Sequence, residues 1–185
     1  MIGFTLAKAP PHRRFVIMAP EHLVDARKPI PACEANWETS GELTFNQDAD
    51  LVWFMPHMHL RGKDMTFRLI YPDGREETVL SVKYNFNWQL GYEVEKPIKV
   101  TKGTRMVVTA HHDNSANNPM NPAPDKDVLW GELTSQEMML PWFGVVVEGE
   151  VQPDAIASYK PGDFDGFVPI FRRDALQPAI LRQSR

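Results

Sequence analysis

Short apolar runs separated by turn-forming residues are the feature that most constrains the fold of this chain. Each run is bounded by Pro, Gly, Asn or Asp, and runs of this length with period-two alternation are typical of strands. Seven or eight such strands at this spacing predict an all-β fold, an antiparallel jelly-roll β-sandwich with little helix. The runs lie at 14–18, 42–46, 50–56, 65–71, 78–84, 92–100, 105–111 and 143–151.

The turn between two of these runs has a clear chemical basis. In "IYPDGREE", Pro72 presets φ for the turn and Gly74 tolerates positive φ. We therefore expect residues 65–71 and 78–84 to form a hairpin. Gly103, in "VTKGTR", predicts a second turn of the same kind.

Helix signals are few. Thr134 precedes Glu137 by three residues in "TSQE", which predicts one capped helical turn, and residues 172–183 predict a short surface helix. The long stretch 113–127 is rich in turn formers, and such loops are either disordered or functional. Within it, Asp113 and Asn114 are expected to form Asx-turns.

Composition and charge exclude several classes of protein. The chain of 185 residues fits one domain with extra segments, and its net charge of -4 shows no basic footprint for nucleic acid. The longest apolar runs fall far short of the roughly 20 residues of a membrane helix. The N-terminus lacks a basic start followed by an apolar segment, so no signal peptide is expected. The lone Cys33, expected to be a packed free thiol, rules out an internal disulfide and a thiolate zinc cluster.

The stretch "LVWFMPHMHLRG", residues 51–62, ends a hydrophobic strand with two histidines. Residues i and i+2 share one face of a strand, so the Cβ atoms of His57 and His59 should lie roughly 6 to 7 Å apart. Both rings could then reach one metal ion at about 2 Å. Met58 points to the opposite face and should be a core residue. Because both faces are otherwise apolar, the pair is expected against a largely dry interior.

Other interpretations of the histidine pair remain open. Two exposed or hydrogen-bonded histidines at a strand end would also fit the pattern. A cupin site would have a glutamate about four residues after the second histidine, but Lys63 and Asp64 stand there. The cupin interpretation is therefore disfavoured.

A third ligand must come from elsewhere in the chain. His111 and His112 end an apolar strand on opposite faces, and two methionines follow Glu137. Methionines can fill a core or act as thioether ligands. Two histidines and a methionine form a soft, incomplete set that favours copper, especially Cu(I), and leaves a coordination position open. The candidates in the sequence are His111, His112, Glu137, Met138 and Met139.

Four blocks, "PHMHLRGKDM", "NFNWQLGYEV", "HHDNSANNPMNP" and "WGELTSQEMM", carry a family resemblance by their order and spacing. Together they resemble the copper type II, ascorbate-dependent monooxygenases, relatives of peptidylglycine α-hydroxylating and dopamine β-monooxygenases, and bacterial members in particular. The resemblance covers about residues 10–150. It is confined to the C-terminal of the family's two jelly-roll domains, the one that holds the copper called M.

The resemblance implies a site and a chemistry. The copper ligands would be His57, His59 and Met138, with His111 as a possible additional ligand. The copper would bind and activate O₂ for hydroxylation of a C–H bond in an unknown small organic substrate, with ascorbate as the external reductant. Gln89, Tyr92 and Glu137 are expected to line this site and orient its ligands.

The chain departs from the family in two respects. The family's other domain, with its three-histidine copper called H, would lie upstream, and "MIGFTLAKAPPHRR" resembles its closing strand and the linker that follows. We therefore expect residues 1–20 to be linker, 21–152 the copper domain, and 153–185 a C-terminal extension. Met55 and Leu140 occupy places where the peptide hydroxylase holds its substrate's carboxylate, so a peptide ending in glycine is not the expected substrate.

These features lead to one main hypothesis and two competitors. The main hypothesis is a monooxygenase copper domain that is inactive without its electron-donating partner domain and that belongs to a periplasmic or secreted protein. The second is a non-catalytic β-sandwich that binds copper or a partner protein. The third is a metal-free interaction domain.

Overall fold

The computed structural model describes residues 3, 5–6, 8–9, 12–18, 28–149 and 151–159. Within these ranges the chain is built almost wholly of strands, and each of the eight predicted strands is present. The elements are β1 (Arg13–Met18), β2 (Trp37–Phe45), β3 (Ala49–Met58), β4 (Gly62–Ile70), β5 (Glu76–Lys83), β6 (Tyr92–Val100), β7 (Arg105–His112), β8 (Met139–Glu148), α1 (Pro153–Ile156) and β9 (Ala157–Tyr159).

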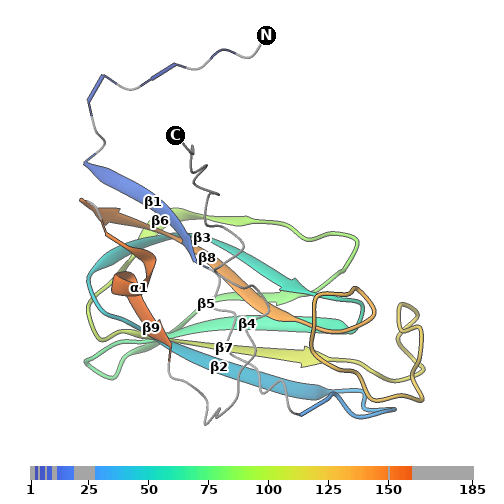
Figure 1. Ribbon diagram of the computed structural model, residues 1–185. Helices are drawn as coiled ribbons and strands as arrows, with labels where there is room; N and C mark the ends of the chain where they lie inside the picture. Colours follow the sequence, from blue (N-terminus) through green and yellow to red (C-terminus); the bar gives the residue numbers. More distant parts are fainter. Residues whose placement is uncertain are drawn as a thin grey trace, which may run out of the picture.

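Two antiparallel sheets form the two layers of a sandwich (Figure 1). One sheet, called here the β3 sheet, has the strand order β1-β8-β3-β6, and the other, the β4 sheet, has the order β5-β4-β7-β2-β9. Consecutive strands mostly cross between the sheets, which gives the jelly-roll arrangement expected from the sequence. The predicted hairpin is β4 and β5, and Gly74 in its turn has a φ of 87°.

The core lies between the sheets and contains edge-to-face aromatic pairs. The rings of Phe54 and Phe67 are 5.0 Å apart, and those of Phe45 and Phe143 are 5.9 Å apart. Each pair joins one strand of the β3 sheet to one strand of the β4 sheet. As predicted, Met58 is fully buried among these core residues.

A β-bulge in β3 decides which face the histidines occupy. The pairing of β3 with both of its neighbours shifts between Leu51 and Trp53. Leu51 and Phe54 therefore both face the core, although they are three residues apart. Beyond the bulge the alternation continues in the shifted phase, so His57 points to the outer face of the sheet. The pair therefore lies on the face opposite to the core-facing Met58, as the alternation predicted. It does not lie in the interior between the sheets, although His59 is itself buried.

Some of the local predictions were wrong, and one was confirmed. Residues 134–136 form a turn, not a helix, and the Gln136 N–H donates to the Leu133 carbonyl. Cys33 is exposed, not packed. Asp113 does form an Asx-turn by accepting from the Ser115 N–H, whereas the amide of Asn114 is buried and bonded elsewhere. The single helical turn α1 was not predicted.

Two further predictions concern helices. The surface helix expected at 172–183 falls on residues that the structure does not describe. Across the described part of the chain, no helix is long and apolar enough to span a membrane.

Candidate metal centre

A hollow on the outer face of the β3 sheet is built from two cross-strand pairs of β3 and β8 and from the residues that follow β3 and precede β8. In the ladder Met55 lies opposite Trp142 and His57 opposite Leu140, so His59 and Met138 follow at the next outward position. The hollow has a volume of about 410 Å³. Its lining residues, which define what we call the histidine hollow, are Met55, His57, His59, Glu132, Met138, Leu140 and Trp142.

The two histidine rings lie close to each other. Their centroids are 5.3 Å apart and their planes are nearly perpendicular, at 87°. A metal about 2 Å from a ring nitrogen lies about 3 Å from that ring's centroid, so one ion can bridge this separation. The geometry therefore agrees with the shared face predicted from the sequence.

Protein acceptors hold the Nδ1 atoms of both rings. His57 Nδ1 lies 2.6 Å from Gln89 Oε1, and Gln89 Nε2 donates to the Phe86 carbonyl at 3.1 Å, which fixes the orientation of the amide. His59 Nδ1 lies 3.2 Å from the Gln136 carbonyl. Because these oxygens can only accept, Nδ1 carries the proton in each contact, and the Nε2 of a neutral ring would hold the lone pair that a metal needs. The His59 ring has a second backbone hydrogen-bond partner in Leu133.

The state of His59 also suits a metal ligand. Its side chain is buried, and burial lowers the pKa of His59 below its usual value. The ring is therefore neutral at pH 7, and neutral imidazole is the form that binds metal.

The methionine doublet is divided between the two faces of β8. Met138 lines the histidine hollow, whereas Met139 is buried in the core opposite Met58. Period-two alternation explains this division, because neighbouring residues of a strand point to opposite faces. The candidate ligand suggested by the family resemblance is thus the methionine that faces the histidines.

Glu137 connects the segment that holds His59 to the segment that holds Met138. Its fully buried carboxylate accepts the backbone N–H groups of His59 at 3.0 Å, Arg61 at 2.7 Å and Met138 at 3.3 Å. Burial raises the pKa of Glu137 to about 7, while these N–H donors and the Arg61 guanidinium, 4.0 Å away, lower it. One side chain therefore contacts the backbone at both candidate ligand positions.

Arg61 connects this carboxylate to the long loop. The guanidinium is buried and donates to Asn114 Oδ1 at 2.9 Å and to the Ser135 carbonyl at 3.0 Å. Asn114 in turn donates to the carbonyls of Pro31 and Lys126. The loop 113–127 is thus held in place by side-chain hydrogen bonds that begin beside the ligands.

His112 lies behind Met138 in the same buried region. Its Nε2 is 3.3 Å from the Met138 carbonyl, and its ring packs edge-on against Trp130 at 5.2 Å. Burial lowers the pKa of His112 to about 4, so the ring is neutral and its Nε2–H donates to that carbonyl. His112 thus supports the backbone of Met138 and does not line the histidine hollow.

Not all predicted site residues come together. His111 lies on the other sheet, where its Nδ1 is 2.6 Å from Asp64 and its Nε2 is 3.4 Å from Glu38. It therefore stands apart from His57 and His59. Tyr92 does not line the histidine hollow either, but it lines a small neighbouring cavity with Gln89.

Sequence reasoning missed some residues of this region. Trp142 is in phase with Met138 on β8, so the period-two pattern could have identified it. Arg61, Glu132 and Asn114 offered no such signal, because their contacts join segments far apart in the chain. Arg61 and Asn114, for example, are 53 positions apart.

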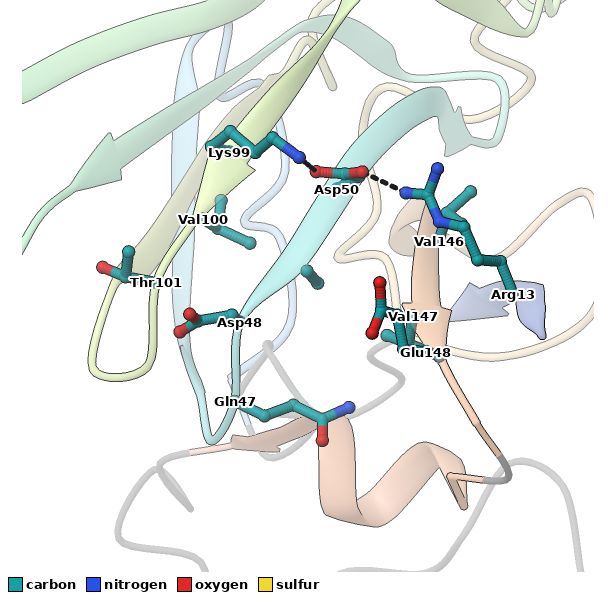
Figure 2. A pocket seen from close by; sticks show the side chains of 11 residues that line it. Arg13, Gln47, Asp48, Asp50, Lys99, Val100, Thr101, Val146, Val147 and Glu148 are labelled. Atoms are coloured by element: carbon teal, nitrogen blue, oxygen red, sulfur yellow. Dashed lines mark hydrogen bonds and ion pairs between the residues drawn. The ribbon is translucent and has the colours of Figure 1, made fainter.

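A second and larger hollow, of about 680 Å³, lies at the other end of β3 (Figure 2). Its lining is charged, and Figure 2 shows Asp50 between the side chains of Lys99 and Arg13, which both pair with it. These charges satisfy one another, and no histidine or methionine lines this hollow among the described residues. We therefore place the candidate metal centre in the histidine hollow, although it is the smaller of the two.

The donor set of the histidine hollow is unusual in composition. The described residues contain no group of three or more His, Cys, Asp and Glu side chains arranged to hold a metal. A site here would thus depend on the thioether of Met138, which suits a soft ion such as Cu(I). No protein-family model matches the chain, and the comparison with curated proteins finds no match.

Proposed function

We propose that this chain is a copper-binding domain that activates O₂ for hydroxylation of a C–H bond, with ascorbate as the external reductant. One observation carries the proposal. His57, His59 and Met138 line one hollow, and a protein oxygen lies within hydrogen-bond distance of Nδ1 of each histidine ring. The resemblance of the sequence to the copper type II monooxygenases supplies the reaction class.

The residues present fit a copper ion. Imidazole nitrogens bind copper and a thioether is a soft donor that favours Cu(I), and three donors leave a coordination position open for a small molecule. When bound, copper supplies the one-electron chemistry that O₂ activation needs. The protein holds the donors: Gln89 and the Gln136 carbonyl orient the rings, and Glu137 fixes the backbone of His59 and Met138.

Hydroxylation needs two electrons, and a single copper ion supplies one. We therefore propose that the domain acts with a second copper domain, as the family resemblance implies. The periplasmic or extracellular location of that family is part of the same proposal.

A second candidate function is a non-catalytic β-sandwich that binds copper and a partner protein. The observation that favours it is the apolar outer edge of the β3 sheet. Phe15 and Ile17 of β1 are 53% and 48% exposed there, and neither residue lines the histidine hollow. Apolar side chains grouped on a surface are typical of contact sites.

Copper titration tests the proposal. We expect the chain to bind one Cu(I), measured by competition with a chromogenic chelator, and His57→Ala with His59→Ala to abolish that binding. His111→Ala, which changes a histidine on the other sheet, is the matched control and should leave binding unchanged. Equal copper binding by the wild type and the double variant would disprove the site.

Oxygen uptake separates the two candidate functions. On the proposal, ascorbate-driven O₂ consumption appears only when a second copper domain is supplied. If no such domain and no candidate substrate raises uptake above the background of free copper, the non-catalytic function is favoured.

A further inference from the structure

His111 stands in a row of polar side chains across the outer face of the β4 sheet. In the ladder it lies opposite Glu38 of β2 on one side and opposite Asp64 of β4 on the other. The strands β2, β7 and β4 are neighbours in this sheet (Figure 1). Ala110 and His112, the neighbours of His111 on β7, are buried, so the His111 ring points away from the core.

Each nitrogen of the His111 ring faces a carboxylate. Nδ1 is 2.6 Å from Asp64 Oδ1, and because an ionised carboxylate can only accept, Nδ1 carries the proton of this short hydrogen bond. Nε2 is 3.4 Å from Glu38 Oε2, beyond the roughly 2.7 to 3.2 Å of an N–H···O hydrogen bond. In a neutral ring the lone pair of Nε2 therefore faces the lone pairs of Glu38. A cation between these two atoms would stabilise the arrangement.

The separation of Nε2 and the Glu38 oxygen fits a metal ion better than a proton. Zinc lies about 2.0 to 2.1 Å from an imidazole nitrogen and about 2.0 to 2.2 Å from a carboxylate oxygen. At a tetrahedral angle, two such bonds place the nitrogen and the oxygen about 3.3 Å apart. Asp64 on the far nitrogen then completes the carboxylate–histidine–metal arrangement that orients metal-bound histidines.

The donors at His111 differ in kind from those of the histidine hollow. One imidazole and one carboxylate suit Zn²⁺ and other divalent ions better than Cu(I), which prefers sulfur. Because Asp64 bonds the far nitrogen, two protein donors face the ion position, which agrees with the absence of a larger His, Cys, Asp and Glu group among the described residues. The remaining positions of a tetrahedral ion are left to water. The side chains of His111 and Glu38 are 24% and 64% exposed, so an ion can reach them from solvent.

We propose that His111 and Glu38 bind a divalent transition-metal ion such as Zn²⁺ on the outer face of the β4 sheet, with Asp64 holding the His111 ring. This site needs neither the candidate copper centre nor the reaction proposed above. An ion bound there joins β2 to β7. Because the unfolded chain does not bring these donors together, the Tm of the chain rises with the concentration of free Zn²⁺.

Zinc titration of the full chain tests the site. The host for the titration is the variant His57→Ala with His59→Ala, in which the histidine hollow cannot compete for zinc. We expect calorimetry to show one bound Zn²⁺ in this host, and the ¹⁵N signal of His111 Nε2 to move on binding. The same movement is expected in the wild type, which makes the result independent of the folding of the host.

Three further substitutions in this host identify the donors. His111→Ala should abolish zinc binding. Asp64→Asn keeps an acceptor for Nδ1 but loses the charge, so zinc affinity should fall about tenfold or more. Glu38→Gln removes a direct donor and should cause a larger loss than Asp64→Asn. Glu42→Gln is the matched control, because Glu42 lies on the same face of β2 and its carboxylate pairs with Arg105 at 2.8 Å.

The outcomes decide between a built site and a general attraction of cations. An Nε2 signal of His111 that does not respond to Zn²⁺, or equal zinc affinity with and without His111→Ala, overturns the proposal. An equal loss in Glu38→Gln and Glu42→Gln would show that only the surface charge attracts the ion, and it would overturn the proposal too. A zinc-dependent rise in Tm that His111→Ala removes and Glu42→Gln keeps supports it. Cu(I) binding by the wild type is measured separately, so failure of the copper centre leaves this test unaffected.

Discussion

The carboxylate of Glu137 accepts the backbone N–H of His59 at 3.0 Å, which joins the turn after β3 to the segment just before β8. The same carboxylate accepts from Arg61 and Met138. Two strands that meet side by side in the sheet are thus joined again at their ends by one buried side chain. We therefore expect the loss of Glu137 to be costly.

Removing Glu137 should strongly destabilise the fold. Glu137→Ala leaves the Arg61 guanidinium buried without its carboxylate, and we expect a loss of about 3 to 5 kcal/mol in the free energy of unfolding. Glu137→Gln keeps the shape and one acceptor oxygen, so a loss of about 2 kcal/mol is expected. Urea denaturation measures both. Losses below about 1 kcal/mol in both variants would show that the network does not support the fold.

Met138 and Met139 form a matched pair for testing thioether ligation. Met138→Leu keeps the volume but removes the sulfur, and we expect Cu(I) affinity to fall about tenfold or more while Cu(II) affinity falls less. Met139→Leu changes the core-facing neighbour and should leave both affinities unchanged. Competition with chelators specific for each oxidation state measures the effect. An equal loss for Cu(I) and Cu(II) would argue against a sulfur ligand.

Gln89 should control which nitrogen of His57 carries the proton. Gln89→Leu removes the oxygen that accepts from Nδ1, so the ring is free to change tautomer, and copper affinity should fall by about 10- to 100-fold. Gln89→Glu restores an acceptor and should recover most of the affinity. The tautomer can be read from ¹⁵N chemical shifts of the ring without any metal. An unchanged tautomer in Gln89→Leu would contradict the assignment.

The ion pairs of Asp50 should give a pH-dependent contribution to stability. The hydrogen bond from Lys99, together with Arg13, lowers the pKa of Asp50 below its usual value. A carboxyl group with a lowered pKa stabilises the fold above its unfolded pKa of about 4, and that contribution is lost as the pH falls through the folded pKa. Because Arg13 and Lys99 are largely exposed, we expect only about 1 kcal/mol.

Asp50→Asn measures this contribution. The variant should be less stable than the wild type at pH 7, and the difference should shrink as the pH falls below about 4. Asp125→Asn, at an exposed loop position, is the control. A stability difference that stays constant down to pH 2 would show that the charge of Asp50 is not its cause.

Gly62 should not tolerate a side chain. A Cβ there would lie 2.6 Å from both Met58 Cβ and Tyr84 Cδ1, and the Gly62 N–H donates to the His59 carbonyl at 3.2 Å. We expect Gly62→Ala to cost about 1 to 3 kcal/mol in unfolding free energy and to shift the ring signals of His59. Gly74→Ala is the comparison, because its Cβ would meet nothing within 4 Å and only its positive φ is strained. Unchanged His59 signals would contradict the expectation.

The strands could be predicted because their signals are local. Alternation and turn residues within a few positions are enough to locate β4, its hairpin partner β5 and the shared face of His57 and His59. The bulge between Leu51 and Trp53 is different, because it arises from pairing with two other strands. Sequence alternation counted from Leu51 would place His57 on the core side. The direction of the pair was therefore predictable from the neighbouring Met58 but not from alternation counted along the whole strand.

The support of the site was even less accessible to sequence reasoning. Glu137 was expected to line the site, but the "TSQE" pattern also suggested that it capped a helical turn. Its carboxylate instead bonds the backbone of Arg61, 76 positions away. A buried arginine has no local signature, since exposed and buried arginines look alike in a sequence. Only the folded structure shows which arginine is shielded from water and therefore needs hydrogen-bond partners in the protein.

The placement of the candidate ligands on neighbouring strands has a consequence for how such a domain can diversify. The separation between the histidines of β3 and the methionine beside β8 follows from the strand spacing of about 4.8 Å, which hardly varies between sheets. Loops 85–91 and 131–137 supply Gln89 and Glu132 from outside that ladder. Insertions or exchanges in these loops can therefore change access to the hollow while the distances between the candidate ligand atoms stay constant.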